Sequence, residues 1–78
     1  MRIIDLLHKI KWDKNLNKND FNIVYFDRIN KNKIEVAFKK IKRVEGNFMI
    51  IEVNQEESNI PLHRIKQIKQ KGNVIWQR

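Results

Sequence analysis

His63 and Arg64 are the residues of this sequence whose types and spacing best suit the binding of a phosphate group. They follow Pro61, whose ring fixes the backbone just before them. A guanidinium offers a fork of donors that matches phosphate oxygens, and a neighbouring imidazole adds a hydrogen bond or, when protonated, a positive charge. The pair predicts a corner that binds anions. A histidine that only caps the backbone of a hairpin is the structural alternative.

Asp27 and Arg28 form a second charged pair, inside the otherwise apolar stretch FNIVYFDRI of residues 21–29. Neighbouring residues of a strand point to opposite faces, and charges are uncommon in strand interiors. One interpretation places Arg28 at the binding groove, with Asp27 orienting a donor. The other interpretation makes both residues rim charges that are paired across strands.

Three aromatic residues could stack on nucleic-acid bases, namely Trp12, Tyr25 and Trp76. In so small a chain a tryptophan more often fills the core. We interpret Trp76 in this way, and its replacement by alanine would then cost about 3–5 kcal/mol of stability. Trp12 follows the first predicted helix, and its context leaves both roles open. His8 lies beside the apolar stripe of that helix, which favours a structural role.

The residue types give little support to catalysis. Neither His8 nor His63 is followed closely by a hydroxyl residue, as paired-histidine phosphodiesterases require, and Ser58 is the only serine. A serine triad would need Ser58, in an acidic loop, to meet His63 and a buried carboxylate. The sequence also has no cysteine, no metal-ligand spacing and no glycine-rich loop. We expect a binding protein without cofactor or metal; an enzyme using His63 as acid or base is the alternative.

The charge of the chain is uneven. The formal net charge is +8, from 17 lysines and arginines against 9 acidic residues. From Ile60 onward there is no acidic residue, while the basic residues of this stretch are Arg64, Lys66, Lys69, Lys71 and Arg78. Such a basic stripe indicates a polyanionic partner, with Lys66 and Lys69 extending the phosphate-binding surface. A surface that merely keeps the chain dissolved is the alternative.

The elements that must position these residues can be read from periodicity. An amphipathic helix is predicted over residues 2–11, because Ile3, Ile4, Leu7 and Ile10 share one helical face. Alternation and β-branched residues predict strands over residues 21–29, 33–38 and 48–53. Residues 39–47 fit either a short helical turn or a basic crossover, and residues 54–59 are predicted to be a polar loop. A closing hairpin is expected around Gly72.

These elements predict one small basic α+β domain over residues 1–78. We expect an N-terminal helix packed on a curled antiparallel sheet of about four to five strands, ending in a hairpin. Strict alternation in the hairpin puts Ile65 and Lys69 on one face and Arg64, Lys66 and Ile68 on the other. No internal repeat is visible. The charged start argues against a signal peptide and no apolar run is long enough to span a membrane, so we expect a cytoplasmic protein without membrane contact.

Four stretches in order resemble a small archaeal family whose domain is described as an RNA cyclic-group end recognition domain. They are DLLHKIKWD (5–13), YFDRI (25–29), IPLHRI (60–65) and GNVIWQR (72–78). The family motif W-D falls on Trp12 and Asp13, D-R on Asp27 and Arg28, P-x-H-R-I on residues 61–65, and V-x-W on residues 74–76. Many relatives have proline or arginine after W-D, whereas this chain has KNLNKND.

The resemblance implies a non-catalytic module that binds processed RNA 3′ ends such as a 2′,3′-cyclic phosphate. It also implies RNA-processing and RNA-repair proteins as partners, because the domain occurs fused to them. The residues that would bind nucleic acid or phosphate are His63, Arg64, Arg28, Asp27, Trp12, Lys66 and Lys69. A general basic nucleic-acid binder without end preference and a protein-interaction module remain as alternative functions.

Overall fold

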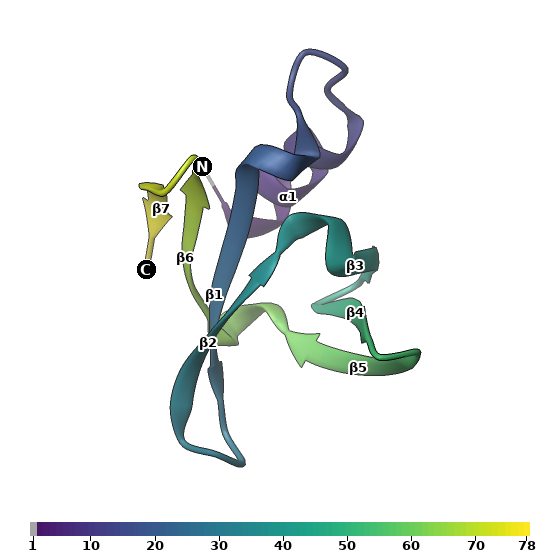
Figure 1. Ribbon diagram of the computed structural model, residues 1–78, viewed down its shortest axis with the longest axis vertical. Coiled ribbons are helices and arrows are strands. Elements are labelled where there is room, and N and C mark those ends of the chain that lie inside the picture. Colours follow the sequence, from purple (N-terminus) through teal and green to yellow (C-terminus); the bar gives the residue numbers. More distant parts are fainter. Residues whose placement is uncertain (1) are drawn as a thin grey trace.

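The computed structural model describes residues 2–78, which form an α-helix, three short 3₁₀ helices and seven strands (Figure 1). The helices are α1 (Ile3–Trp12), η1 (Lys18–Asp20), η2 (Phe38–Lys40) and η3 (Leu62–Arg64). The strands are β1 (Phe21–Asp27), β2 (Asn32–Ala37), β3 (Ile41–Glu45), β4 (Phe48–Val53), β5 (Glu56–Pro61), β6 (Ile65–Gln70) and β7 (Asn73–Gln77).

The strands form two antiparallel sheets. One sheet has four strands in the order β2-β1-β6-β7, and the other has three in the order β3-β4-β5. The chain passes between the sheets twice, through η2 and through η3 (Figure 1). The predicted α+β class, with an N-terminal helix, an antiparallel sheet and a closing hairpin, is confirmed, although the strands are divided between two sheets and are more numerous than expected.

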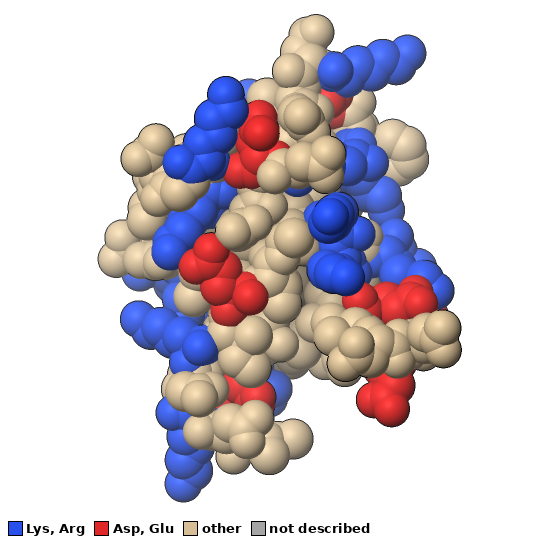
Figure 2. All heavy atoms as spheres, in the orientation of Figure 1, with Lys and Arg blue, Asp and Glu red and all other residues tan. Residues whose placement is uncertain are grey.

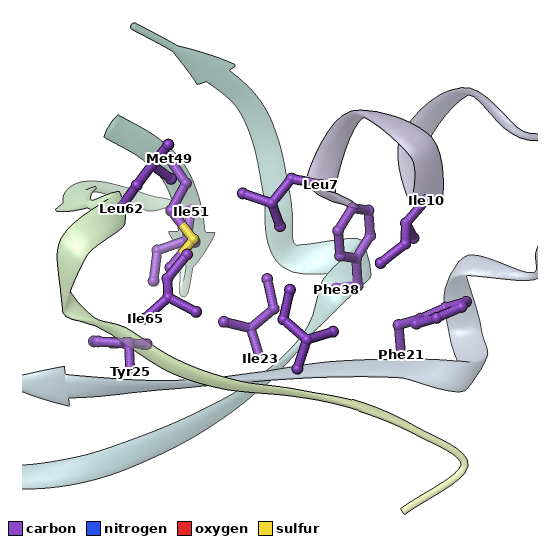
Figure 3. Packing of buried hydrophobic residues seen from close by; sticks show 11 residues of the cluster. Leu7, Ile10, Phe21, Ile23, Tyr25, Phe38, Met49, Ile51, Leu62 and Ile65 are labelled. Atoms are coloured by element: carbon purple, nitrogen blue, oxygen red, sulfur yellow. The ribbon is translucent and has the colours of Figure 1, made fainter. Parts of the chain in front are cut away.

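The core lies where α1 and both sheets meet (Figure 3). Leu7 and Ile10 of α1 are fully buried, as the helical periodicity predicted, while Ile3, Ile4 and Leu6 pack at the edge of the same cluster. The helix packs against apolar residues from both sheets and from the turns η2 and η3, which are the two corners between the sheets. The buried members of the cluster are Leu7, Ile10, Phe21, Ile23, Tyr25, Phe38, Met49, Ile51, Leu62, Ile65 and Ile68. This packing fixes where η3 lies relative to β1.

The prediction of a loop over residues 54–59 is wrong. Asn54 and Gln55 have positive φ angles of 55° and 67°, which makes a tight turn, and Glu56–Pro61 pairs with β4 as a strand. β5 is the edge strand of its sheet, and residues 56–59 are exposed. These residues are therefore polar and do not alternate with apolar ones. An edge strand of this kind gives no alternation signal in the sequence.

The strict alternation predicted for β6 is also wrong. Ile65 and Ile68 are both fully buried, although they should lie on opposite faces of a regular strand. The pairing of β6 with β1 shifts between Gln67 and Ile65, so that Lys66 is the extra residue of a β-bulge. The bulge lets both isoleucines enter the core and leaves Lys66 beside η3.

Of the two structures considered for residues 39–47, the short helical turn is present, but the strand that follows it was not predicted. Lys39 and Lys40 complete the 3₁₀ turn η2, and β3 then carries the chain into the second sheet. The turn that follows contains Gly46 at φ 55°, in the left-handed region that glycine enters without steric cost.

Candidate nucleic-acid interface

Two adjoining hollows lie between the tip of the β1–β2 hairpin and η3, each of about 270 Å³. Both are lined by Phe26, Arg28 and Arg64. The first hollow extends over β5, with the additional lining residues Tyr25, Asp27, Ile29, Ser58, Asn59 and Ile60. The second extends over η3 and β6, where His63 and Lys66 complete its lining. Arg28, His63, Arg64 and Lys66 are called the cationic cluster below.

The corner at η3 holds His63 and Arg64 in place through its neighbours. Pro61 enters the turn at φ −59° and ψ 137°, and Leu62 is buried in the core. Arg78 supports the turn from outside, since its Nη2 donates to the Leu62 carbonyl oxygen and its Nε to that of Ile65, both at 3.1 Å. The corner is therefore anchored on both sides, which directs His63 to solvent and leaves Arg64 half-buried.

Asp27 accepts hydrogen bonds within the tip of its own hairpin. Its carboxylate accepts hydrogen bonds from the Ile29 N–H at 2.9 Å and from the Asn30 side-chain amide at 2.8 Å, which closes the hairpin tip beside Arg28. These hydrogen bonds, that of the Asn30 side chain first, lower the pKa of Asp27, and the nearby charge of Arg64 lowers it further. Asp27 thus shapes the loop that presents Arg28.

The floor between the cations is aromatic. Phe26 lines both hollows, and Tyr25 lines the first although only 8% of its surface is exposed. Burial raises the pKa of the Tyr25 hydroxyl, and the Asp27 charge adds to this effect. An apolar floor beneath several cations suits a ligand that joins a flat ring to an anionic group.

Two of the predicted site residues lie away from this cluster. Lys69 Nζ is 2.9 Å from Glu35 Oε1, and Glu35 also accepts from the Asn22 amide, so this lysine joins a group on three neighbouring strands. Trp12 lines neither hollow; it is 74% exposed at the end of α1, with the Lys11 Nζ 5.6 Å from its ring centroid.

Trp76 and His8 lie outside both hollows as well. Trp76 packs against the core from the edge strand β7 and is only partly buried, with the Arg78 guanidinium carbon 5.3 Å from its ring centroid. Trp76 thus lies at the edge of the core and is not fully enclosed in it. His8 is exposed on α1.

Several lining residues were missed by sequence reasoning. Ser58, Asn59 and Ile60 reach the first hollow only because β5 is a strand, and nothing in the polar sequence predicted that strand. Ile29, 90% exposed at the hairpin tip, also lines it. The sequence did contain a signal for Phe26. It follows the core-facing Tyr25 in a strand, so its side chain is expected on the opposite face, and it directly precedes the charged pair Asp27–Arg28.

The cluster offers cations and hydrogen-bond donors. Ser58 and His63 line different hollows. Within residues 2–78, no group of three His, Cys, Asp or Glu side chains could hold a metal ion. The same part of the chain contains no helix that is long and apolar enough to cross a membrane.

Basic side chains are also distributed beyond the cluster. Figure 2 shows lysines and arginines over much of one face, separated by small groups of acidic residues. What distinguishes the cationic cluster is that its members line two adjoining hollows.

Comparison with known proteins gives matches along the whole chain. Residues 1–78 match the family described as the MJ1316 RNA cyclic group end recognition domain. A UPF0248 protein of Saccharolobus islandicus (strain L.S.2.15) is 32% identical over 81 residues, which cover 100% of both chains. A UPF0248 protein of Metallosphaera sedula is 33% identical over 78 residues, covering 100% of this chain and 94% of that protein. No solved structure matches.

Proposed function

Because this chain belongs to the archaeal family of the MJ1316 RNA cyclic group end recognition domain, whose members include uncharacterised UPF0248 proteins, we propose that it binds processed RNA 3′ ends without cleaving them. The ligand would be a 2′,3′-cyclic phosphate terminus, held by the cationic cluster. RNA-processing proteins would be its partners. The module would deliver an RNA end to them or protect that end until they act.

The observation that carries this proposal is the convergence of Arg28 and Arg64 on one pair of hollows from distant parts of the chain. Two guanidinium forks can grip the two free oxygens of a phosphodiester ring from different directions. His63 and Lys66 add donors at the rim, while Phe26 and Tyr25 supply an apolar surface for the sugar or base.

Charge alone would select a different end. A cyclic phosphate carries one negative charge, whereas a terminal 3′-phosphate carries about −1.5 to −2 at neutral pH. Simple attraction to cations therefore favours the 3′-phosphate. A preference for the cyclic end requires shape, namely a pocket whose donors meet a compact ring and whose apolar floor excludes a more hydrated dianion.

The decisive experiment compares one short RNA that ends in a 2′,3′-cyclic phosphate, a 3′-phosphate or a 3′-hydroxyl. Fluorescence anisotropy at moderate salt should show the tightest binding for the cyclic end. Arg28→Gln and Arg64→Gln should each weaken that binding by about 10–100-fold, as the loss of about 1.5–3 kcal/mol from charge-assisted hydrogen bonds implies. Lys71→Gln is the matched control, because it removes one exposed charge from the β6–β7 turn.

Other results would point to the alternative functions. Tightest binding of the 3′-phosphate, or equal affinities with a steep salt dependence, would leave a general basic binder. Absence of RNA binding at low salt would favour a protein-interaction module, for which the exposed Val74 and Ile75 of the edge strand β7 are the first residues to test. Conversion of the cyclic end, detected by mass spectrometry and lost in His63→Ala, would identify an enzyme.

A further inference from the structure

The two crossings between the sheets have the same construction. At the first, Ala37 leads into Phe38-Lys39-Lys40 and then Ile41-Lys42; at the second, Pro61 leads into Leu62-His63-Arg64 and then Ile65-Lys66. Each turn begins with a buried apolar residue, continues with two basic residues, and ends with an isoleucine whose N–H donates to the carbonyl of that apolar residue. A short repeat that the sequence alone did not reveal is thus present.

The backbone angles support this equivalence. The residue before each turn has φ −68° and ψ 141° at Ala37, against −59° and 137° at Pro61. The residue after it has φ −77° and ψ 119° at Ile41, against −69° and 125° at Ile65. In both cases the strand pairing then shifts at the next lysine, so each corner is followed by a bulge.

The corner at η2 also lines a hollow of its own, of about 400 Å³. Its lining residues are Lys39, Lys40, Ile41, Lys42, Glu52, Asn54 and Gln55. The three lysines occupy the same places along the chain as His63, Arg64 and Lys66 do at the other corner. Lys42 differs from its counterpart, because its Nζ lies 2.8 Å from Glu52 and 3.0 Å from Glu57. Lys39 and Lys40 are exposed, so their charges are the ones available to a ligand.

We propose that the corner at η2 is a second phosphate subsite, which binds a backbone phosphodiester of the same RNA strand whose 3′ end lies at η3. This inference rests on the proposed RNA-binding function. Lysines act as point charges without the planar fork of arginine, so they suit an internal phosphate that needs no shape selection. The construction of the two corners therefore assigns end selection to η3 and strand binding to η2.

An exposed aromatic ring lies on the same flank. Lys11 Nζ donates to the Lys42 carbonyl oxygen at 3.5 Å, and the same ammonium lies 5.6 Å from the centroid of the Trp12 ring. Trp12 is 74% exposed with lysines around it in sequence, at positions 9, 11 and 14. A ring with an ammonium group beside it favours a nucleotide base over an apolar protein surface, because the base brings its own negative phosphate. Trp12 would stack on a base of the strand bound at η2.

The test uses two RNAs with the same cyclic end, a dinucleotide and a dodecanucleotide, since single-strand sites span about 4–16 nucleotides. Lys39→Gln/Lys40→Gln should weaken binding of the dodecanucleotide by about tenfold at low salt and leave the dinucleotide unchanged. It should also lower the salt slope of the long RNA by about 1.4, because each lost contact to a single strand contributes about 0.7. Lys33→Gln/Lys71→Gln is the charge-matched control, because both lysines are exposed and neither lines a hollow. Lys39→Arg/Lys40→Arg should bind like the parent protein.

Trp12 gives an independent readout. In a Trp76→Phe background, Trp12 is the remaining tryptophan, and its fluorescence should be quenched by the dodecanucleotide but not by the dinucleotide. The inference is overturned if Lys39→Gln/Lys40→Gln binds both RNAs like the parent protein, or if the control pair loses as much affinity. Persistent dependence on Lys39 and Lys40 without any preference among 3′ ends would sustain the second subsite while refuting the proposed end recognition.

Discussion

Replacing Arg78 by alanine should loosen the η3 corner although Arg78 lines neither hollow. Its two hydrogen bonds to the Leu62 and Ile65 carbonyls brace both ends of the turn, and its guanidinium lies over Trp76. A hydrogen bond from a charged donor contributes about 1.5–3 kcal/mol when shielded, and about 1 kcal/mol is expected for each here because Arg78 is exposed. The contact with the ring adds about 0.5–1 kcal/mol.

The expected loss is thus about 2–3 kcal/mol, which lowers the Tm of a domain of this size by about 10–20 °C. Thermal unfolding followed by circular dichroism measures it, with Lys71→Ala as a control that removes one charge from the same hairpin. Arg78→Lys keeps the charge but lacks the fork, and should lie between the two. The salt slope of RNA binding should stay unchanged in Arg78→Ala, because a residue that only braces the turn releases no counterions. Equal melting of Arg78→Ala and Lys71→Ala, or a slope reduced by about 0.7, would refute the bracing role.

Three further predictions concern the core, the hairpin tip and the edge strand. Ile65→Ala should lose about 3–4 kcal/mol in urea unfolding, because its side chain is fully buried; a loss below 1 kcal/mol would contradict its place in the core. The folded state lowers the pKa of Asp27. Its stabilisation of the hairpin tip is therefore complete above the pKa of the unfolded state, about 3.9, and is lost as the pH falls through the lower pKa of the folded state. The protection factors of the Ile29 and Asn30 amides, which remove the intrinsic pH dependence of hydrogen exchange, should therefore fall as the pH falls through that range and should not change with pH in Asp27→Ala. Trp76→Ala should cost about 2–3 kcal/mol, less than a fully buried tryptophan; unchanged stability with weakened RNA binding would place its ring in the interface.

Local residue types predicted most of the elements that pack on the core. The helix repeats its apolar residues at helical spacing, whereas β1, β2, β4 and the closing hairpin were indicated by β-branched and aromatic residues between turn signals. Edge strand β5 was missed because it is held by pairing with β4 through the Asn54–Gln55 turn rather than by an apolar face of its own. The order of the strands and their division into two sheets depend on such long-range pairing.

The sequence could predict those parts of the candidate site that are made by residues adjacent in the chain. The pairs at positions 27–28 and 63–64 both line the hollows, and Asp27 also accepts hydrogen bonds within its own turn. The sequence Asp27-Arg28-Ile29-Asn30 contains the signal that was overlooked, since aspartate commonly accepts from the backbone N–H two residues later. Lys69 was placed with the cluster by counting charge alone, whereas Glu35 on β2 engages it across β1.

The bulge in β6 connects the requirements of the core to the position of the site. A regular strand would place Lys66 and Ile68 on one face, and then either a lysine would enter the core or an isoleucine would leave it. Burial of an unpaired ammonium costs several kcal/mol, so the extra residue of the bulge is the less costly arrangement. With Ile65 and Ile68 both inside, Lys66 lies beside Arg64 at the second hollow. The same shift follows the η2 corner at Lys42, where Ile41 and Val44 pack against the core. Each corner thus combines apolar residues that pack on the core with basic residues that line a hollow.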